Sequence, residues 1–97
     1  MDNSTNFRIT NSKNHFVELR LEPWGDVLTM NDGATFNIHS SGMSNDVVEI
    51  DILDNAFVIY AGEGMTMNVF EGNKDLTEGM SCESVRIPKG LLSRGEK

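Results

Sequence analysis

Apolar and polar residues alternate in short segments along most of the chain. In the clearest segment, residues 15–22, the side chains of Val17, Leu19 and Leu21 share one face of an extended chain and polar side chains share the other. This alternation predicts a strand with one buried face and one solvated face. Similar segments return about every ten residues between Gly-rich or Asn/Asp-rich turns. The predicted strands are residues 7–10, 15–22, 26–30, 34–39, 47–52, 56–60, 65–70 and 85–87.

This spacing predicts an all-β fold with about six to eight short strands in a small antiparallel sandwich or barrel. No helical stripe of useful length competes with it. Residues 56–60 are apolar on both faces, which predicts a central strand. The dipeptide Asp32-Gly33 is typical of a hairpin, and it predicts that residues 26–30 pair with residues 34–39.

The strand pattern is interrupted after residue 22 by Pro23, Trp24 and Gly25. Proline removes a backbone donor and glycine permits a sharp change of direction, so the first long strand should end at this corner. Trp24 is the chain's only tryptophan. We expect it to close one end of the core, and the alternative is an exposed binding anchor.

The length of 97 residues fits one domain. We expect residues 1–6 to be a disordered lead-in, residues 7–88 to form the β domain and residues 89–97 to be a flexible basic tail. The predicted strand at residues 85–87 is isolated from the main pattern. One hypothesis is that it adds to the sheet of a neighbouring subunit.

The net charge of −7 is distributed unevenly. Between residues 26 and 83, eleven acidic residues face only one basic residue, Lys74, whereas residues 84–97 carry a net charge of +3. An acidic body repels phosphate backbones, so we expect no direct binding of nucleic acid. The simplest role of the acidic residues is solubility, and the alternative is an acidic face that a partner recognises.

The sequence also indicates a cellular compartment. It contains no apolar run near the roughly 20 residues of a membrane span, and its N-terminus lacks the pattern of a signal peptide. Cys82 is the only cysteine, so no intrachain disulfide can form, and without a nearby base we expect no catalytic role for it. We therefore expect a cytoplasmic protein that does not contact a membrane.

The residue types that act in catalysis or metal binding do not form a recognisable motif in the sequence. His15 and His39 are the only histidines and lack the further ligands that a metal site needs. No calcium loop, phosphate loop or nucleophile elbow is present. We therefore expect no catalytic residue, no metal ligand and no cofactor. The candidate partner-binding residues are Trp24, Glu49, Asp51 and Asp54.

Several segments between residues 17 and 72 resemble a family of small, uncharacterised bacterial β-proteins with a Glu-Pro-Trp-Gly corner. The similarity is carried by residues 21–25, 31–36, 48–50, 64–66 and 69–70. It implies a fold and supplies no activity.

The strands around Gly-Ala-Thr-Phe, before His39, are also similar in outline to cupins and jelly rolls. Cupin metal sites use a His-x-His pair, whereas His39 is followed by Ser40 and Ser41. The similarity therefore implies a cupin-like or jelly-roll-like domain without the metal.

These observations favour a non-catalytic binding or assembly module. Its partner would be an unknown protein or a second copy in a homodimer, because no catalytic constellation is present and some strands are apolar on both faces. One alternative is a small acidic, phage-like inhibitor that occupies a basic nucleic-acid-binding groove on a target protein. Another is a cupin-like small-molecule-binding domain that lacks the metal motif.

Overall fold

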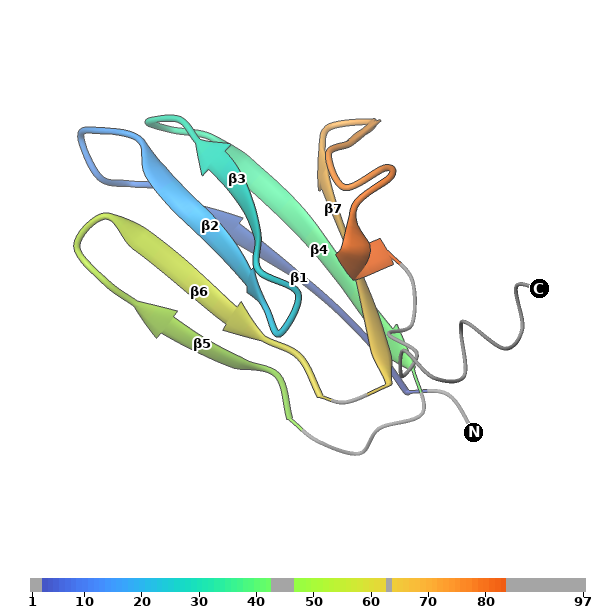
Figure 1. Cartoon of the computed structure of the whole chain (residues 1–97). Helices are drawn as coiled ribbons and strands as arrows, with labels where there is room; N and C mark the ends of the chain where they lie inside the picture. Colours follow the sequence, from blue (N-terminus) through green and yellow to red (C-terminus); the bar gives the residue numbers. More distant parts are fainter. Residues whose placement is uncertain (1–2, 43–46, 63, 84–97) are drawn as a thin grey trace.

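A computed structural model of the chain describes residues 3–42, 47–62 and 64–83, and these residues are built almost entirely from strands and turns (Figure 1). The only helix among them, η1, has three residues, and no helix in this part of the chain is long and apolar enough to cross a membrane. The all-β prediction is confirmed. The elements are β1 (Asn3–Thr10), β2 (Val17–Glu22), β3 (Asp26–Met30), β4 (Thr35–Gly42), β5 (Glu49–Ile52), β6 (Ala56–Tyr60), β7 (Met65–Glu71), β8 (Lys74–Asp75) and η1 (Ser81–Glu83).

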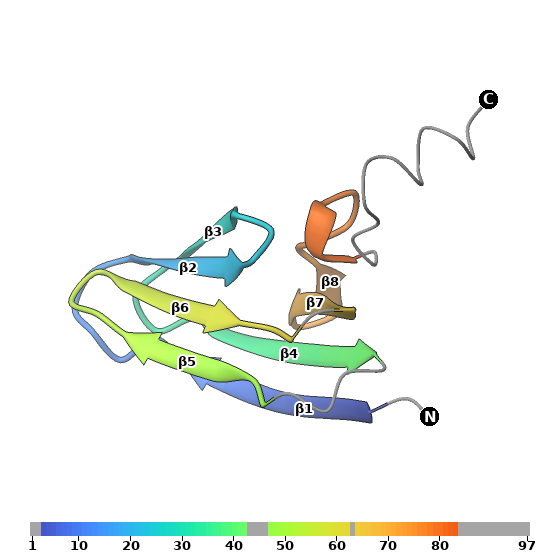
Figure 2. The same ribbon diagram turned by 60° about the horizontal axis from the view of Figure 1, so that its bottom comes forward.

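The strands form two four-stranded sheets that pack as a small sandwich (Figure 2). Sheet A has the order β1-β4-β7-β8, and sheet B has the order β3-β2-β6-β5. All neighbouring pairs are antiparallel except β2 and β6, which run parallel with Leu19 opposite Phe57. The predicted central strand is confirmed, because β6 lies between β2 and β5 and its residues Ala56–Ile59 are buried.

The core fills the space between the sheets. The inward side chains of β2, β4 and β7 alternate with more exposed ones, as the sequence pattern predicts, whereas β6 is buried on both faces. Cys82, in η1, is also fully buried in this core, and its backbone N–H donates to Asp26 Oδ2 at 2.9 Å. The core residues are Val17, Leu19, Leu21, Met30, Phe36, Ile38, Phe57, Ile59, Met67, Val69 and Cys82.

The predicted hairpin at Asp32-Gly33 is wrong. Strand β3 pairs with β2, whereas β4 pairs with β1 and β7, so the turn between β3 and β4 carries the chain from one sheet to the other. The Ala34 N–H donates to the Asn31 carbonyl at 3.0 Å within this turn. The chain therefore reverses locally, but the strands on either side of the turn separate.

Asn11 holds this crossover in place. Its side chain is fully buried, and its Nδ2 donates to the carbonyl oxygens of His15, Met30 and Asn31 at 2.9, 3.0 and 3.1 Å. Its backbone N–H donates to the Ala34 carbonyl, and its own carbonyl accepts from the Gly33 N–H, both at 2.9 Å. Asn11 thus joins the loop after β1 to the turn after β3, which directs β4 into pairing with β1.

The corner at Pro23, Trp24 and Gly25 is the true hairpin. It connects β2 to β3, and the Gly25 N–H donates to the Leu21 carbonyl at 2.9 Å. Gly25 has φ of 79°, a left-handed conformation that glycine adopts without steric cost. Trp24 is partly buried and packs against the core, so in this structure it closes one end of the sandwich.

The N-terminal segment also differs from the prediction. Residues 3–6 were expected in the disordered lead-in, but β1 begins at Asn3 and pairs with β4 along its whole length. Sheet hydrogen bonds join backbone groups, so a polar segment can extend an edge strand when its neighbour offers free partners. The predicted strand at residues 85–87 and the predicted tail at residues 89–97 lie outside the described residues.

Candidate functional site

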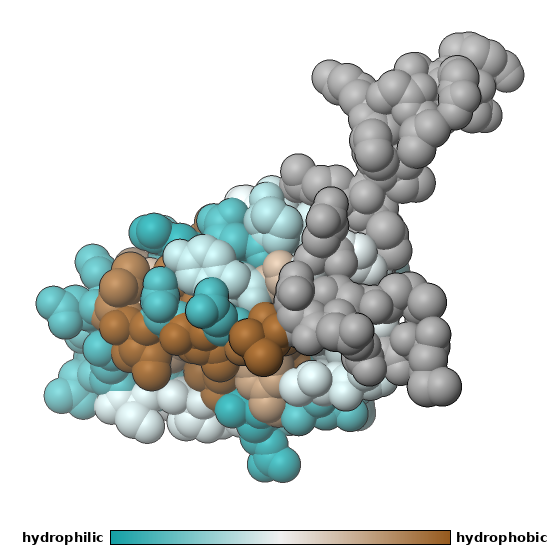
Figure 3. Space-filling model, turned by 90° about the horizontal axis from the view of Figure 1, so that it is seen from below, coloured by the Kyte–Doolittle hydropathy of each residue, from teal (hydrophilic) through white to brown (hydrophobic). Residues whose placement is uncertain are grey.

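An apolar surface lies along β5. Seven large apolar residues are exposed in the described part of the chain, and four of them fall between residues 47 and 53. We call these four residues the β5 margin. Figure 3 shows the apolar surface in brown on the side of the molecule that carries β5. The members of the margin are Val47, Ile50, Ile52 and Leu53.

Two members of the β5 margin, Ile50 and Ile52, continue the core face of sheet B. In the register, Ile50 lies opposite Ile59 and Ile52 lies opposite Phe57, so these isoleucines belong to the face that is buried on β6. Strand β5 is an edge strand, however, and Ile52 keeps 72% of its surface exposed. Exposed apolar surface of this kind marks an interaction site more often than scattered single residues do.

The outer face of β5 is acidic. Glu49 lies opposite Tyr60 in the β5–β6 register, and Glu22 lies opposite Tyr60 in the β2–β6 register. The pKa of Tyr60 is raised above its ordinary value, first by partial desolvation of the phenol. The negative charge of Asp51, hydrogen bonding to that carboxylate, and the charges of Glu22 and Glu49 raise this pKa further. The β5 strand therefore presents one apolar face and one acidic face.

Tyr60 gives this acidic face a spectroscopic signature, because it is the chain's only tyrosine. We expect the phenolate absorbance to appear with a midpoint above the ordinary value of about 10. The raised pKa favours the protonated phenol in the folded state. Its contribution to stability is therefore present below about pH 10 and is lost as the pH rises through the raised pKa.

The Asp51→Asn variant separates the causes of this shift. Removing the carboxylate charge is expected to move the Tyr60 midpoint towards its ordinary value in an absorbance titration of the folded protein. Asp54→Asn is the matched control, because Asp54 is not among the groups that shift Tyr60, and it should leave the midpoint in place. Equal midpoints in Asp51→Asn and the wild type would contradict the assigned cause.

The predicted partner-binding residues do not form one patch. Glu49 and Asp51 lie together on the outer face of β5, and Asp54 lies in the turn that leads to β6. Trp24 lies in the β2–β3 turn and packs on the core, with β2 and β6 between it and β5. The β5 margin was not predicted from the sequence, although the alternation places Ile50 and Ile52 on one face.

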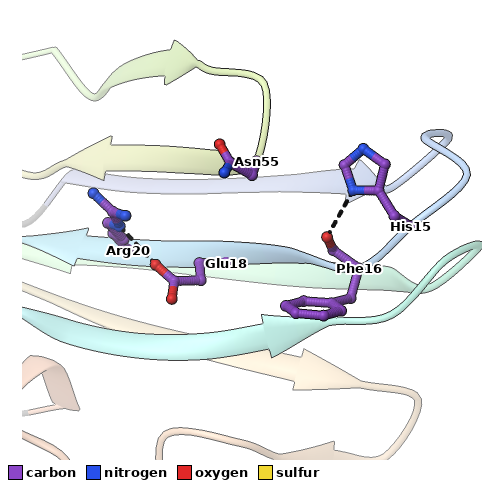
Figure 4. A pocket seen from close by; sticks show the side chains of 5 residues that line it. All are labelled: His15, Phe16, Glu18, Arg20 and Asn55. Carbon is purple, nitrogen blue, oxygen red and sulfur yellow. Dashed lines mark hydrogen bonds and ion pairs between the residues drawn. The ribbon is translucent and has the colours of Figure 1, made fainter.

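A surface hollow of about 440 Å³ lies beside the start of β2 (Figure 4). Phe16, which is 61% exposed, forms part of its lining, and the Arg20 Nε donates to Glu18 Oε1 at 2.9 Å. The His15 Nδ1 lies 2.9 Å from the Phe16 carbonyl oxygen. The Arg20 guanidinium is thus paired with the Glu18 carboxylate, and the His15 imidazole is paired with the Phe16 carbonyl. This arrangement suits contact with a ligand more than proton transfer.

The histidines and the cysteine do not converge. His15 precedes β2 and is exposed, His39 lies on the outer face of sheet A, and Cys82 is inside the core. Within residues 3–42, 47–62 and 64–83, no group of three or more His, Cys, Asp or Glu side chains could hold a metal ion.

Comparisons with protein-family models, with curated protein sequences and with solved structures found no match. The resemblance to small bacterial β-proteins and the cupin-like outline therefore stay predictions. The candidate site must be interpreted from its own geometry.

Proposed function

We propose that the chain is a non-catalytic assembly module that forms a homodimer through the β5 margin. The observation that carries the proposal is the exposure of Ile52, 72%, on the sheet face that elsewhere forms the core. Burying a side chain of this size is worth about 1.5–3 kcal/mol. A second copy that presents the same four residues supplies the apolar surface needed to cover them.

The charges on β5 favour one geometry of association. If two β5 strands paired edge to edge, the acidic outer faces with Glu49 and Asp51 would lie next to each other, and like charges across neighbouring strands are destabilising. If the two β5 margins pack against each other instead, these carboxylates stay in solvent. We therefore propose an interface made by the apolar faces rather than a continuous sheet.

The Ile52→Glu variant tests this interface. A carboxylate at the centre of an apolar contact loses the burial of isoleucine and adds a desolvation cost, so we expect self-association to weaken by at least about tenfold. Sedimentation velocity over a range of concentrations measures this change by comparing the mass in solution with the 10.8 kDa of one chain.

Val27→Glu is the matched control for this experiment. Val27 is 49% exposed on the outer face of β3, at the opposite edge of the same sheet, so this variant should associate as the wild type does. A wild type that stays strictly monomeric at high concentration would overturn the proposal. Equal association of Ile52→Glu and the wild type would overturn it as well.

The acidic face gives a second candidate function, an inhibitor that occupies a basic nucleic-acid-binding groove on another protein. Glu22, Glu49 and Asp51 place their charges around the exposed Tyr60, and this arrangement favours the candidate. Binding to such a target should fall steeply with added salt and should weaken in Asp51→Asn. Binding that does not respond to salt would count against it.

A cupin-like small-molecule-binding domain without the metal motif is the third candidate. Side chains fill the space between the sheets, so surface hollows such as that in Figure 4 offer more room for a ligand. We also propose a cytoplasmic location, which is supported by the single cysteine, because one cysteine cannot form an intrachain disulfide.

A further inference from the structure

The outer face of sheet A carries a second surface, separate from the β5 margin. Two hollows of about 260 and 320 Å³ adjoin there and share Asn37 and His39 in their lining. Asn6 and Arg8 contribute to the first hollow, and Phe70 and Asn73 contribute to the second. The two hollows therefore neighbour each other on β1, β4 and β7.

The strand register places these side chains in two rows. Arg8, Asn37 and Phe70 lie side by side across β1, β4 and β7. Asn6, His39 and Asn68 form the neighbouring row on the same face. Because regular strands hold both rows, the spacing of the polar groups is set by the sheet rather than by a loop.

Asparagine is an unusual choice at these positions. It is depleted in strands, whereas threonine is solvated equally well and favours the extended chain. The same face uses threonine at positions 10, 35 and 66 but asparagine at Asn6, Asn37 and Asn68. Among the described residues, these three asparagine side chains make no hydrogen bond. Their donors and acceptors are therefore free to meet a ligand.

The chemistry of the site selects the ligand. An amide offers both a donor and an acceptor, which matches a hydroxyl group that does the same. The rings of His39 and Phe70 lie 5.2 Å apart at 53° and provide apolar surface beside the amides. The residues lining the two hollows include no acidic side chain, although the chain has a net charge of −7. Free amides next to aromatic rings match a sugar ring, which has a hydroxylated edge and an apolar face.

We propose that the outer face of sheet A binds a neutral oligosaccharide. Asn6, Asn37 and Asn73 hydrogen-bond its hydroxyl groups, and Phe70 with His39 packs against the apolar face of a sugar ring. The site lies on the sheet opposite β5, so saccharide binding does not depend on the proposed homodimer.

Nuclear magnetic resonance titration tests this proposal on the full chain. The probes are maltohexaose, cellohexaose and xylohexaose, with hexagalacturonate as a charged comparison. We expect at least one neutral probe to shift the side-chain amide signals of Asn37 and Asn73 in a saturable manner. The Asn37→Thr variant keeps the strand and removes the amide, and it should weaken that binding by about tenfold or more.

Asn55→Thr is the matched control, because it makes the same chemical change in the hollow beside sheet B. It should leave saccharide binding unchanged, and the backbone spectrum of each variant reports whether the fold is intact. The proposal is overturned if none of the neutral probes gives a saturable shift, if only hexagalacturonate binds, or if Asn37→Thr binds as tightly as the wild type.

Discussion

Replacing Asn11 with alanine is expected to lower the free energy of unfolding by about 3–5 kcal/mol. The Asn11 side chain is fully buried, its amide donates to three carbonyl oxygens and its Oδ1 accepts from the Lys13 N–H at 2.9 Å. Alanine would remove all four bonds, including the buried one to the Met30 carbonyl, whereas the Asn31 carbonyl would keep the Ala34 N–H. Because the whole fold is worth about 5–15 kcal/mol, this loss is a large share of it.

The Asn11→Asp variant sharpens the prediction. It keeps the size of the side chain but turns a carboxylate oxygen towards carbonyl oxygens that now accept from Nδ2, so it should be at least as unstable as Asn11→Ala. Urea denaturation followed by circular dichroism measures both variants. Asn14→Ala is the control, because Asn14 is exposed in the same loop and should change stability by less than about 0.5 kcal/mol. A loss below about 1 kcal/mol for Asn11→Ala would contradict the assigned role.

Trp24→Ala is expected to lower the free energy of unfolding by about 3 kcal/mol. Trp24 is partly buried against the core at the β2–β3 hairpin, so its removal exposes that end of the sandwich to water. The expected loss is at the lower end of the range for a large aromatic side chain because part of the ring is already solvated.

Circular dichroism should follow the unfolding of this variant, since the mutation removes the only fluorescent tryptophan. The Trp24→Phe variant retains an aromatic ring and should lose about 1 kcal/mol. A Trp24→Ala protein that is as stable as the wild type but no longer self-associates would contradict the role in the core and support a binding anchor.

The sequence pattern predicted individual strands better than their pairing. Alternation located β2 and β7, and the doubly apolar segment correctly indicated that β6 is central. Both the corner at Gly25 and the turn at Gly33 carry turn residues, so local chemistry could not show which turn is the hairpin. The hydrogen bonds of Asn11 determine which turn is the hairpin, and they link residues about 20 positions apart.

The β5 margin could not be predicted from the sequence for a related reason. Ile50 and Ile52 have the same alternation as Leu19 and Leu21, yet the latter are fully buried and Ile52 is largely exposed. The difference arises because β2 lies inside its sheet and β5 lies at the edge. A periodic pattern shows which side chains share a face, but it does not show what covers that face.

The C-terminal part of the core was even harder to predict from the hydrophobic pattern of the sequence. Thr77 and Cys82 are fully buried, but no periodic apolar segment surrounds them. Thr77 is held by hydrogen bonds, since its Oγ1 donates to Asp75 Oδ1 at 2.7 Å and accepts from the Val69 N–H at 3.2 Å. Such specific contacts depend on the folded arrangement and cannot be inferred from hydrophobic spacing.

The most direct measurement of the proposed assembly is the accessibility of the Ile52 methyl groups to a soluble paramagnetic reagent in nuclear magnetic resonance. We expect their relaxation enhancement to fall as the protein concentration rises, because a second copy covers the β5 margin. The Val27 methyl groups, on the opposite edge of sheet B, should stay equally accessible throughout. Ile52 methyl groups that remain as accessible at high concentration as at low concentration would contradict the proposed homodimer.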